Sequence, residues 1–252
     1  MIERTASRAV EIRPRRSLYH AEGGWFSANW HFSFDRYQDG TQVGWGDLRV
    51  FNDDRLVPGA AWPLHPHRDI EGVTYVAEGT FEHADSQGNG GVLLAGSVQR
   101  VTLGSGLWHS ERNGSTTEPL RFIQLWIMPS RRGLEPSVEQ RSFSEASRRD
   151  LLRPVLVPAP GYGGAGAPRA EGALTVHQDA AMYAGLLSPG ATVTHRLRDG
   201  FGGYLFVVHG DAALDGAAID EGGAAKIGLV GAIAVDAGPS GAELLLVETR
   251  LG

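Results

Sequence analysis

The chain has 252 residues, of which 42% are hydrophobic and 21% are charged, an ordinary composition for a globular protein of one or two domains. Its formal net charge of −6 argues against non-specific binding of nucleic acid, which depends on a basic surface. Cysteine is absent, which excludes disulfides, thiolate ligands and a cysteine nucleophile.

We expect no export signal in the N-terminal region. Residues 1–30 contain no apolar segment of the length that a secretory signal requires. No run of the chain approaches the roughly 20 apolar residues of a membrane span. We therefore expect a cytoplasmic protein that makes no contact with a membrane.

The first 57 residues alternate apolar and polar in short runs, a pattern typical of strands. Aromatic residues are dense here, at Trp25, Phe26, Trp30, Phe32, Phe34 and Tyr37. All six tryptophans precede residue 127, so we expect the first half to own the larger core. The alternative is that some of these rings line a flat aromatic pocket, for which Trp62 is the best candidate.

Two pairs of metal-ligand residues follow, His65 with His67 and His109 with Glu111. Residues two apart in a strand lie on one face, roughly 6 to 7 Å apart, so each pair points both side chains the same way. If the two strands are neighbours inside a barrel, three imidazoles and one carboxylate converge. Such ligands suit Fe, Ni, Cu, Mn, Co or Zn. Ordinary surface histidines near two turns are the alternative, which the matching second pair disfavours.

Residues 72–128 consist of strand signals separated by turns. Val73–Val76 is β-branched and aromatic, residues 85–91 are a turn cluster, and residues 120–127 form another apolar run. Short strands at regular spacing predict a closed or sandwiched all-β module. A jelly-roll barrel fits and supplies the inward face that the ligands require.

Residues 129–170 contain the predicted boundary. A polar break at residues 129–133 is followed by a short helix over residues 144–152, with Ser144 as its N-cap. The Gly, Ala and Pro loop at residues 158–168 is expected to be an exposed connection, with a lid as the alternative. We expect a metal-binding barrel over residues 1–135 and a second barrel over residues 136–252.

The second half of the chain resembles the first as a weak internal repeat. Residues 205–210 resemble residues 74–79, an apolar strand that ends at a turn glycine. This alignment places Arg196 and Arg198 at the positions of His65 and His67. A guanidinium offers no lone pair to a metal, and no histidine follows His209. We therefore predict that the second barrel holds no comparable metal site.

The remaining histidines are isolated in the sequence. We expect three of them, His177, His195 and His209, to be hydrogen-bonded structural residues, because it is clustering that indicates a functional histidine. His83 lies one strand beyond the proposed ligands, and we expect it to support them from outside the metal's own ligand set.

The spacing around the two ligand pairs resembles the two motifs of the cupin family. Gly59 stands six residues before His65, and Gly106 and Asn113 flank His109 as the second motif requires. Cupins usually carry a Glu where this chain has Gly72. The substitution of Glu111 for that carboxylate is the pattern of the pirin branch. Further segments that resemble bacterial pirin-like proteins are residues 48–54, 74–86, 123–129, 139–141 and 176–179.

This resemblance implies an all-β chain of two cupin-type jelly-roll barrels, with a short helix near their boundary. It implies His65, His67, His109 and Glu111 as ligands of a divalent metal ion. Iron is our first choice, and the ligand types also permit Ni, Co, Mn, Cu or Zn. Asp69, Ile70 and Gly72 depart from the commonest pirin form beside this site.

Some pirin-like proteins are described as quercetin 2,3-dioxygenases, so the resemblance implies an oxidoreductase. Its substrates are a small flavonol-like aromatic and O2, and Glu111 is the catalytic base as well as a ligand. The alternative is a non-enzymatic metal-binding regulator with a protein partner, as other pirins are described. A cupin isomerase acting on sugars is a weaker third hypothesis. We expect a monomer.

Overall fold

The alternating runs of the first half form two sheets that face each other as a barrel. The structure, a computed structural model, describes residues 10–251. One sheet has seven strands in the order β12-β9-β6-β11-β4-β3-β2, and the other has four in the order β5-β10-β7-β8. The bounds in the larger sheet are β2 (Tyr19–Glu22), β3 (Phe26–Trp30), β4 (Leu48–Leu56), β6 (Glu71–Glu78), β9 (Ser97–Thr102), β11 (Leu120–Ile127) and β12 (Ser137–Ser142). Those in the smaller sheet are β5 (Ala61–His67), β7 (Thr80–Asp85), β8 (Gly90–Leu94) and β10 (Leu107–Asn113).

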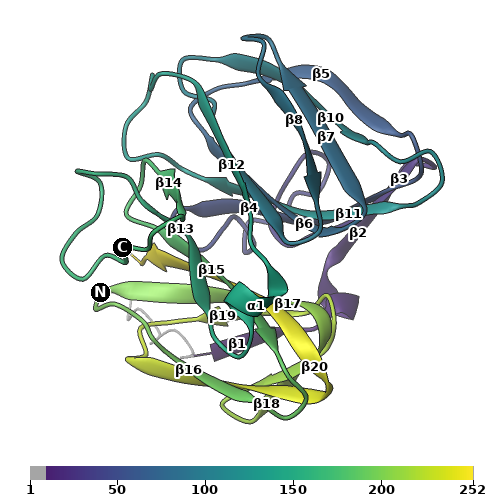
Figure 1. Cartoon of the computed structure of the whole chain (residues 1–252). Coiled ribbons are helices and arrows are strands. Elements are labelled where there is room, and N and C mark those ends of the chain that lie inside the picture. The colour runs from purple at the N-terminus through teal and green to yellow at the C-terminus, as the bar shows by residue number, and fades with distance from the viewer. Residues whose placement is uncertain (1–9, 252) are drawn as a thin grey trace.

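The second half forms a barrel from one strongly bent nine-stranded sheet, which lies below the first barrel in Figure 1. Its main path is β1-β19-β17-β20-β15-β13-β14, with β16 on β20 and β18 on β17. The bounds are β1 (Val10–Arg13), β13 (Arg153–Pro158), β14 (Leu174–Val176), β15 (Ala181–Leu187), β16 (Thr192–Arg196), β17 (Phe201–Leu214), β18 (Ala217–Ile219), β19 (Ala224–Ile227) and β20 (Ala232–Arg250). The predicted fold of two cupin-type barrels is confirmed.

Helical structure is confined to two short segments of the described chain, the 3₁₀ helix Arg15–Ser17 and α1 (Glu145–Arg148). The Ser144 hydroxyl accepts a hydrogen bond from the Ser147 amide, so the predicted N-cap is confirmed. The predicted helix over residues 144–152 is too long, because Asp150 takes a positive φ of 55° and the backbone amide of Asp150 bonds to Leu186 instead. Neither helix has the length or hydrophobicity needed to cross a membrane.

Two strands leave the half of the chain from which they come. β1 pairs with β19 of the second barrel, and β12 pairs with β9 of the first. Each barrel therefore contains a strand from the part of the chain that mainly forms the other barrel. The division of the chain at residue 135 stays a prediction.

The large sheet of the first barrel packs against the second barrel. Phe51 and Tyr75 share one buried cluster with Tyr204 and Phe206. On the same face of β4, the Asp53 carboxylate accepts two hydrogen bonds from Arg121, whose guanidinium also donates to the carbonyl of Val208 across the interface. The other face of the sheet lines the interior of the first barrel.

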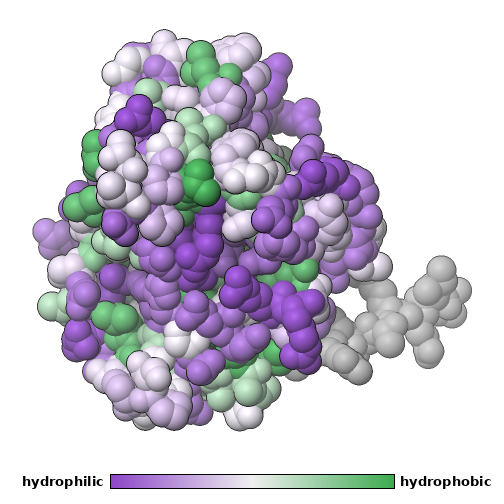
Figure 2. Space-filling model, turned by 90° about the vertical axis from the view of Figure 1, so that its right-hand side faces the viewer, coloured by the Kyte–Doolittle hydropathy of each residue, from purple (hydrophilic) through white to green (hydrophobic). Residues whose placement is uncertain are grey.

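The outer surface agrees with the ordinary composition of the chain. In Figure 2 the visible face is mostly hydrophilic, and the apolar residues form small separate groups. Scattered apolar residues of this kind are normal on a folded domain.

Candidate metal centre

The candidate ligands come from two neighbouring strands, as the spacing predicts. β10 pairs antiparallel with β5, and His109 stands opposite His65. Two positions further along β10, Glu111 stands opposite Trp62, so β5 has one more residue than β10 in this interval. This bulge breaks the alternation of faces and turns Trp62 to the same side as His65, although three residues separate them.

Three imidazoles meet at this point. One ligand atom from each of His65, His67 and His109 lies within 4.8 Å of the other two. The ring centroids are 4.6 Å apart for His65 and His109, and 4.8 Å apart for His65 and His67. In residues 10–251, this is the group of three or more His, Cys, Asp or Glu side chains with that spacing.

The histidine rings are held in the neutral form, which has a nitrogen lone pair available for a metal ion. Burial, with a smaller contribution from the nearby His65, lowers the pKa of His67 to about 4. Burial and the neighbouring histidines lower the pKa of His109 to about 3. Both rings are therefore neutral at pH 7. The Nδ1 of His65 donates to the carbonyl of Pro63 at 2.7 Å, which leaves its Nε2 as the acceptor.

Glu111 lies in the same pocket, from the strand that carries His109. Its carboxylate accepts a hydrogen bond of 3.1 Å from Nε2 of Gln124, whose Oε1 accepts one of 2.6 Å from Thr74. Burial raises the pKa of Glu111 to about 7, against the effect of the Gln124 hydrogen bond. Glu111 is outside the group of three histidines at the 4.8 Å spacing, so its role as a fourth ligand stays a prediction.

A cavity of about 620 Å³ opens beside the histidines. Its aromatic walls are formed by Trp25, Phe26, Trp30, Phe34, Trp62 and Trp126. The Trp62 ring packs edge-on against Trp25 at 4.4 Å, and the His67 ring packs edge-on against Trp126 at 4.7 Å. The alternative expectation that some of these rings line an aromatic pocket, with Trp62 among them, is confirmed. Such walls suit a flat aromatic ligand.

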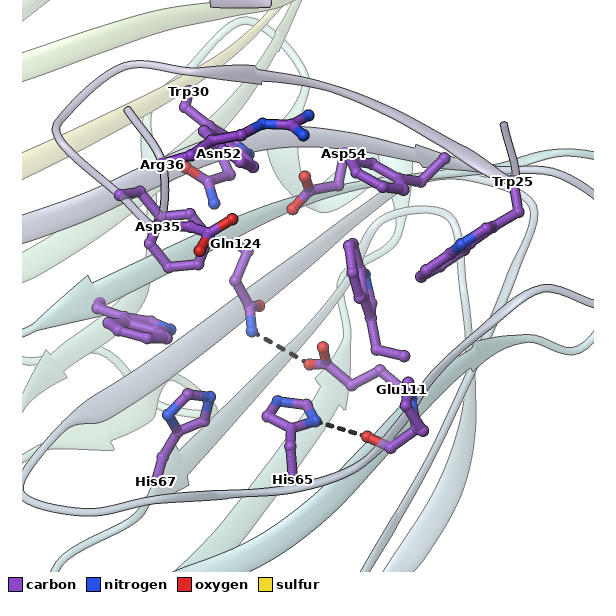
Figure 3. Close-up of a pocket in the computed structure, with 15 residues that line it drawn as sticks. Trp25, Trp30, Asp35, Arg36, Asn52, Asp54, His65, His67, Glu111 and Gln124 are labelled. Atoms are coloured by element: carbon purple, nitrogen blue, oxygen red, sulfur yellow. Dashed lines mark hydrogen bonds between the residues drawn. The ribbon is translucent and has the colours of Figure 1, made fainter. Parts of the chain in front are cut away.

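Sequence reasoning missed the polar side chains on the wall opposite the histidines. Asn52 and Asp54 project from β4 into the cavity, with Gln124 between them and the ligands (Figure 3). The signal present in the sequence was a run of four polar residues, Asn52–Arg55, within a strand that is otherwise mostly apolar.

The residues fit a divalent metal ion. The Nε2 of His109 is buried and has no hydrogen-bond partner in the described chain, a costly state for an imidazole nitrogen that a metal would relieve. Three neutral imidazoles and a carboxylate nearby form a donor set for Fe, Ni, Co, Mn, Cu or Zn.

The other histidines have partners. His177 bonds to Glu71 at 3.0 Å, and His195 bonds to Glu248 at 3.1 Å, which confirms their structural role. His209 lies 3.6 Å from the carboxylate of Glu78. His83 stands opposite Glu111 in the sheet, and its Nε2 donates to Gln140 at 2.8 Å, so its supporting role at the site stays a prediction.

The corresponding region of the second barrel is occupied by ion pairs. Arg198 pairs with Glu248 and Asp179, and its guanidinium stacks 3.6 Å from the centre of the Phe201 ring. Arg198, which the alignment places at the position of His67, therefore neutralises two carboxylates of the second barrel.

Comparison with protein families gives two matches. The family model described as Pirin matches residues 11–127. The model described as the quercetinase C-terminal cupin domain matches residues 165–249.

Relatives match along most of the chain. The Escherichia coli K12 protein named quercetin 2,3-dioxygenase is 38% identical over 208 residues, covering 82% of this chain and 84% of that protein. A pirin-like protein of Caulobacter vibrioides is 34% identical over 239 residues, covering 95% and 99%. The crystal structure of the bacterial pirin YhhW from Escherichia coli in complex with nickel(II) matches with a TM-score of 0.86 and 33% identity, covering 96% and 100%.

Proposed function

The chain belongs to the pirin family of cupin proteins, and on that premise we propose that it is a metal-dependent dioxygenase that cleaves quercetin or a related flavonol with O2. The observation that carries the proposal is a three-histidine cluster that opens into a cavity of about 620 Å³ with aromatic walls. Three relatives or structural neighbours support it by their names as quercetin 2,3-dioxygenases or as a nickel-binding pirin.

We assign the metal to His65, His67 and His109, with Glu111 as the additional ligand. A bound divalent ion supplies positive charge that makes the flavonol 3-hydroxyl more acidic, and it assists the reaction with O2. Iron is the first choice, and Ni, Co, Mn, Cu and Zn fit the same donors.

The residues of the chain bind and orient the substrate. The rings of Trp62 and Trp126 line the cavity and hold a planar ligand by stacking and edge contacts. Their apolar surfaces also keep water from the reacting ring, which strengthens every hydrogen bond made there.

Glu111 takes the proton of the flavonol 3-hydroxyl. In the metal-free protein burial raises the pKa of this carboxyl to about 7, so it can accept and return a proton near neutral pH when it is not bound to the metal. Gln124 and Thr74 hold the carboxylate by a chain of two hydrogen bonds. Both atoms of O2 enter the depside, the central ring loses carbon 3 with its own oxygen as carbon monoxide, and the proton held by Glu111 returns to the product.

The dimensions of the cavity favour the enzyme over the regulatory alternative. A regulator that reads the metal through its surface has no need of a cavity with six aromatic side chains in its lining. The small substrate and O2, rather than a protein, are therefore the partners that this site suits.

Isotopic labelling tests the reaction. The protein, loaded with one divalent metal at a time, is incubated with quercetin under ¹⁸O2, and the products are analysed by mass spectrometry. The proposal predicts depside with both labelled oxygens and unlabelled carbon monoxide. Depside with one label, or quercetin consumed without carbon monoxide, would contradict a dioxygenase.

A further inference from the structure

Two neighbouring aspartates of β4 differ sharply in their surroundings. Asp53 and Asp54 are both buried, 3% and 5% exposed. Asp53 points towards the second barrel and receives two hydrogen bonds from Arg121, at 2.8 and 2.9 Å. Asp54 points the other way, into the cavity, and no side-chain hydrogen bond or ion pair of Asp54 is found in residues 10–251.

Asn52 repeats this situation one step along the same face of β4. Its side chain is 3% exposed, and its Oδ1 is buried without a hydrogen-bond partner in the described chain. Asn52 stands opposite Trp30 on one side and opposite Gln124 on the other. The cavity wall thus contains two adjacent polar side chains whose hydrogen-bonding capacity the protein leaves unused.

These groups have no structural use. A buried polar group without a partner lowers stability, so natural proteins pair most of them. Asp53 shows that this strand can pair an aspartate when the fold requires one. Burial, with Asp53 and Glu111 nearby, raises the pKa of Asp54 well above its usual range, which adds a donor O–H to the acceptor oxygen of that carboxyl.

The position of the pair determines what it can contact. In Figure 3 the Asn52 amide and the Asp54 carboxyl point from the upper wall into the cavity, and His65 and His67 rise from the opposite wall. A planar ligand with one oxygen at the histidines therefore presents its remote end to Asn52 and Asp54. The space between the two walls is lined by aromatic side chains.

We infer that Asn52 and Asp54 form a hydroxyl-recognition pair, which binds the hydroxyl groups that an aromatic substrate carries at the end remote from the three histidines. The inference rests on the proposed function and specifies its substrate class as aromatics with hydroxyl groups at that end. A phenolic hydroxyl both donates and accepts, so it satisfies the Asn52 oxygen and the Asp54 carboxyl in either protonation state.

Binding without turnover tests the pair. Nickel(II)-loaded protein is titrated anaerobically with quercetin and with 3-hydroxyflavone, which has no remote hydroxyls, and quenching of tryptophan fluorescence gives each Kd. We expect wild type to prefer quercetin. Asp54→Leu and Asn52→Leu should each weaken quercetin binding about tenfold or more and change 3-hydroxyflavone binding by less than about threefold.

Thermal unfolding of the metal-free protein gives a second, ligand-independent readout. Asp54→Leu removes an unpaired buried carboxyl beside open space, so we expect Tm to rise by about 2 °C or more. The matched control is Asp53→Leu on the opposite face of β4. This change leaves the buried guanidinium of Arg121 without its carboxylate partner, so it should lower Tm. A fall in Tm for Asp54→Leu would show that this carboxyl is structural and overturn the inference.

The outcomes separate the inference from the proposed function. Equal weakening of both ligands, or of neither, overturns the recognition pair even if wild type turns over quercetin in air. Selective loss of quercetin binding supports the pair even if no metal gives turnover, in which case the dioxygenase fails. Wild type that binds neither ligand overturns both.

Discussion

Glu111 has surroundings that differ from those of an ordinary surface carboxylate. It is buried, and the chain gives it one hydrogen bond, from Gln124. Burial raises its pKa to about 7, so the ionised and neutral forms are close in free energy at neutral pH. A carboxyl in this state is suited to move a proton in either direction.

Glu111→Gln should lower turnover of quercetin by about 100-fold or more, because the amide keeps the size of the side chain and cannot accept the hydroxyl proton. The measurement is kcat and kcat/KM for metal-reconstituted protein, with metal content by elemental analysis. Full metal occupancy together with full turnover would mean that Glu111 is neither ligand nor base.

The clustering of His65, His67 and His109 was predictable from spacing. His65 and His67 match the two-residue repeat of a strand, and His109 stands opposite His65 on the neighbouring strand. Asn52 and Asp54 obey the same repeat and were missed, because an unpaired polar side chain in a strand can be recognised only when its neighbours are known. The difference between Asp53 and Asp54 arises from contacts with distant segments.

Among the elements, the turn after β6 shows how far the two barrels repeat each other. Gly79 has a φ of 82°, and a Cβ there would lie 2.4 Å from the carbonyl oxygen of Pro119. Gly210 has a φ of 75°, and a Cβ there would lie 2.2 Å from the carbonyl oxygen of Gly241. The alignment of Gly210 with Gly79 therefore joins two positions with the same backbone requirement.

Gly79→Ala should lower the free energy of unfolding by about 3 kcal/mol, from the positive φ and the contact with Pro119 together. Gly88→Ala is the matched control, since Gly88 has a φ of 88° and nothing within 4 Å of an added Cβ. We expect that control to cost about 1 kcal/mol. Urea denaturation measures both, and equal losses would show that the close approach at Gly79 is relieved easily.

Strands were easier to predict than their irregularities. β-Branched and aromatic residues identified the segment of β6, and an apolar run identified that of β11. Neither signal carries information on the bulge in β5 that turns Trp62 inward. The pairing of β1 with β19 was equally hidden, because it joins residues about 200 positions apart. Such choices depend on the packing of the whole chain.

At the scale of the whole molecule, a buried group of rings at the interface of the two barrels includes His31, which packs against Phe51 of the first barrel and Tyr204 and Phe206 of the second. The His31 side chain is fully buried, and its Nδ1 accepts a hydrogen bond of 2.6 Å from the hydroxyl of Tyr204 in the second barrel. Burial, with a smaller contribution from Arg13, lowers the pKa of His31 well below its usual value. The folded protein therefore holds this ring neutral.

The stability of the metal-free protein should fall as the pH drops below about 6.5. In that range His31 becomes protonated in the unfolded chain but stays neutral in the folded chain. His31→Gln removes this titration. We expect the slope of unfolding free energy against pH between about pH 5 and pH 6.5 to be smaller in the variant, by up to about 1.4 kcal/mol per pH unit. Parallel curves from urea denaturation would assign the acid sensitivity to other groups.

Metal-dependent flavonol cleavage is tested most directly by the loss of quercetin absorbance in aerated buffer. Apoprotein is reconstituted separately with Fe, Ni, Co, Mn and Cu and compared with His65→Ala treated in the same way. We predict turnover with at least one metal and none with the His65→Ala variant. Confirmed binding of every metal with no turnover by any of them, or equal turnover by the variant, would contradict the assignment.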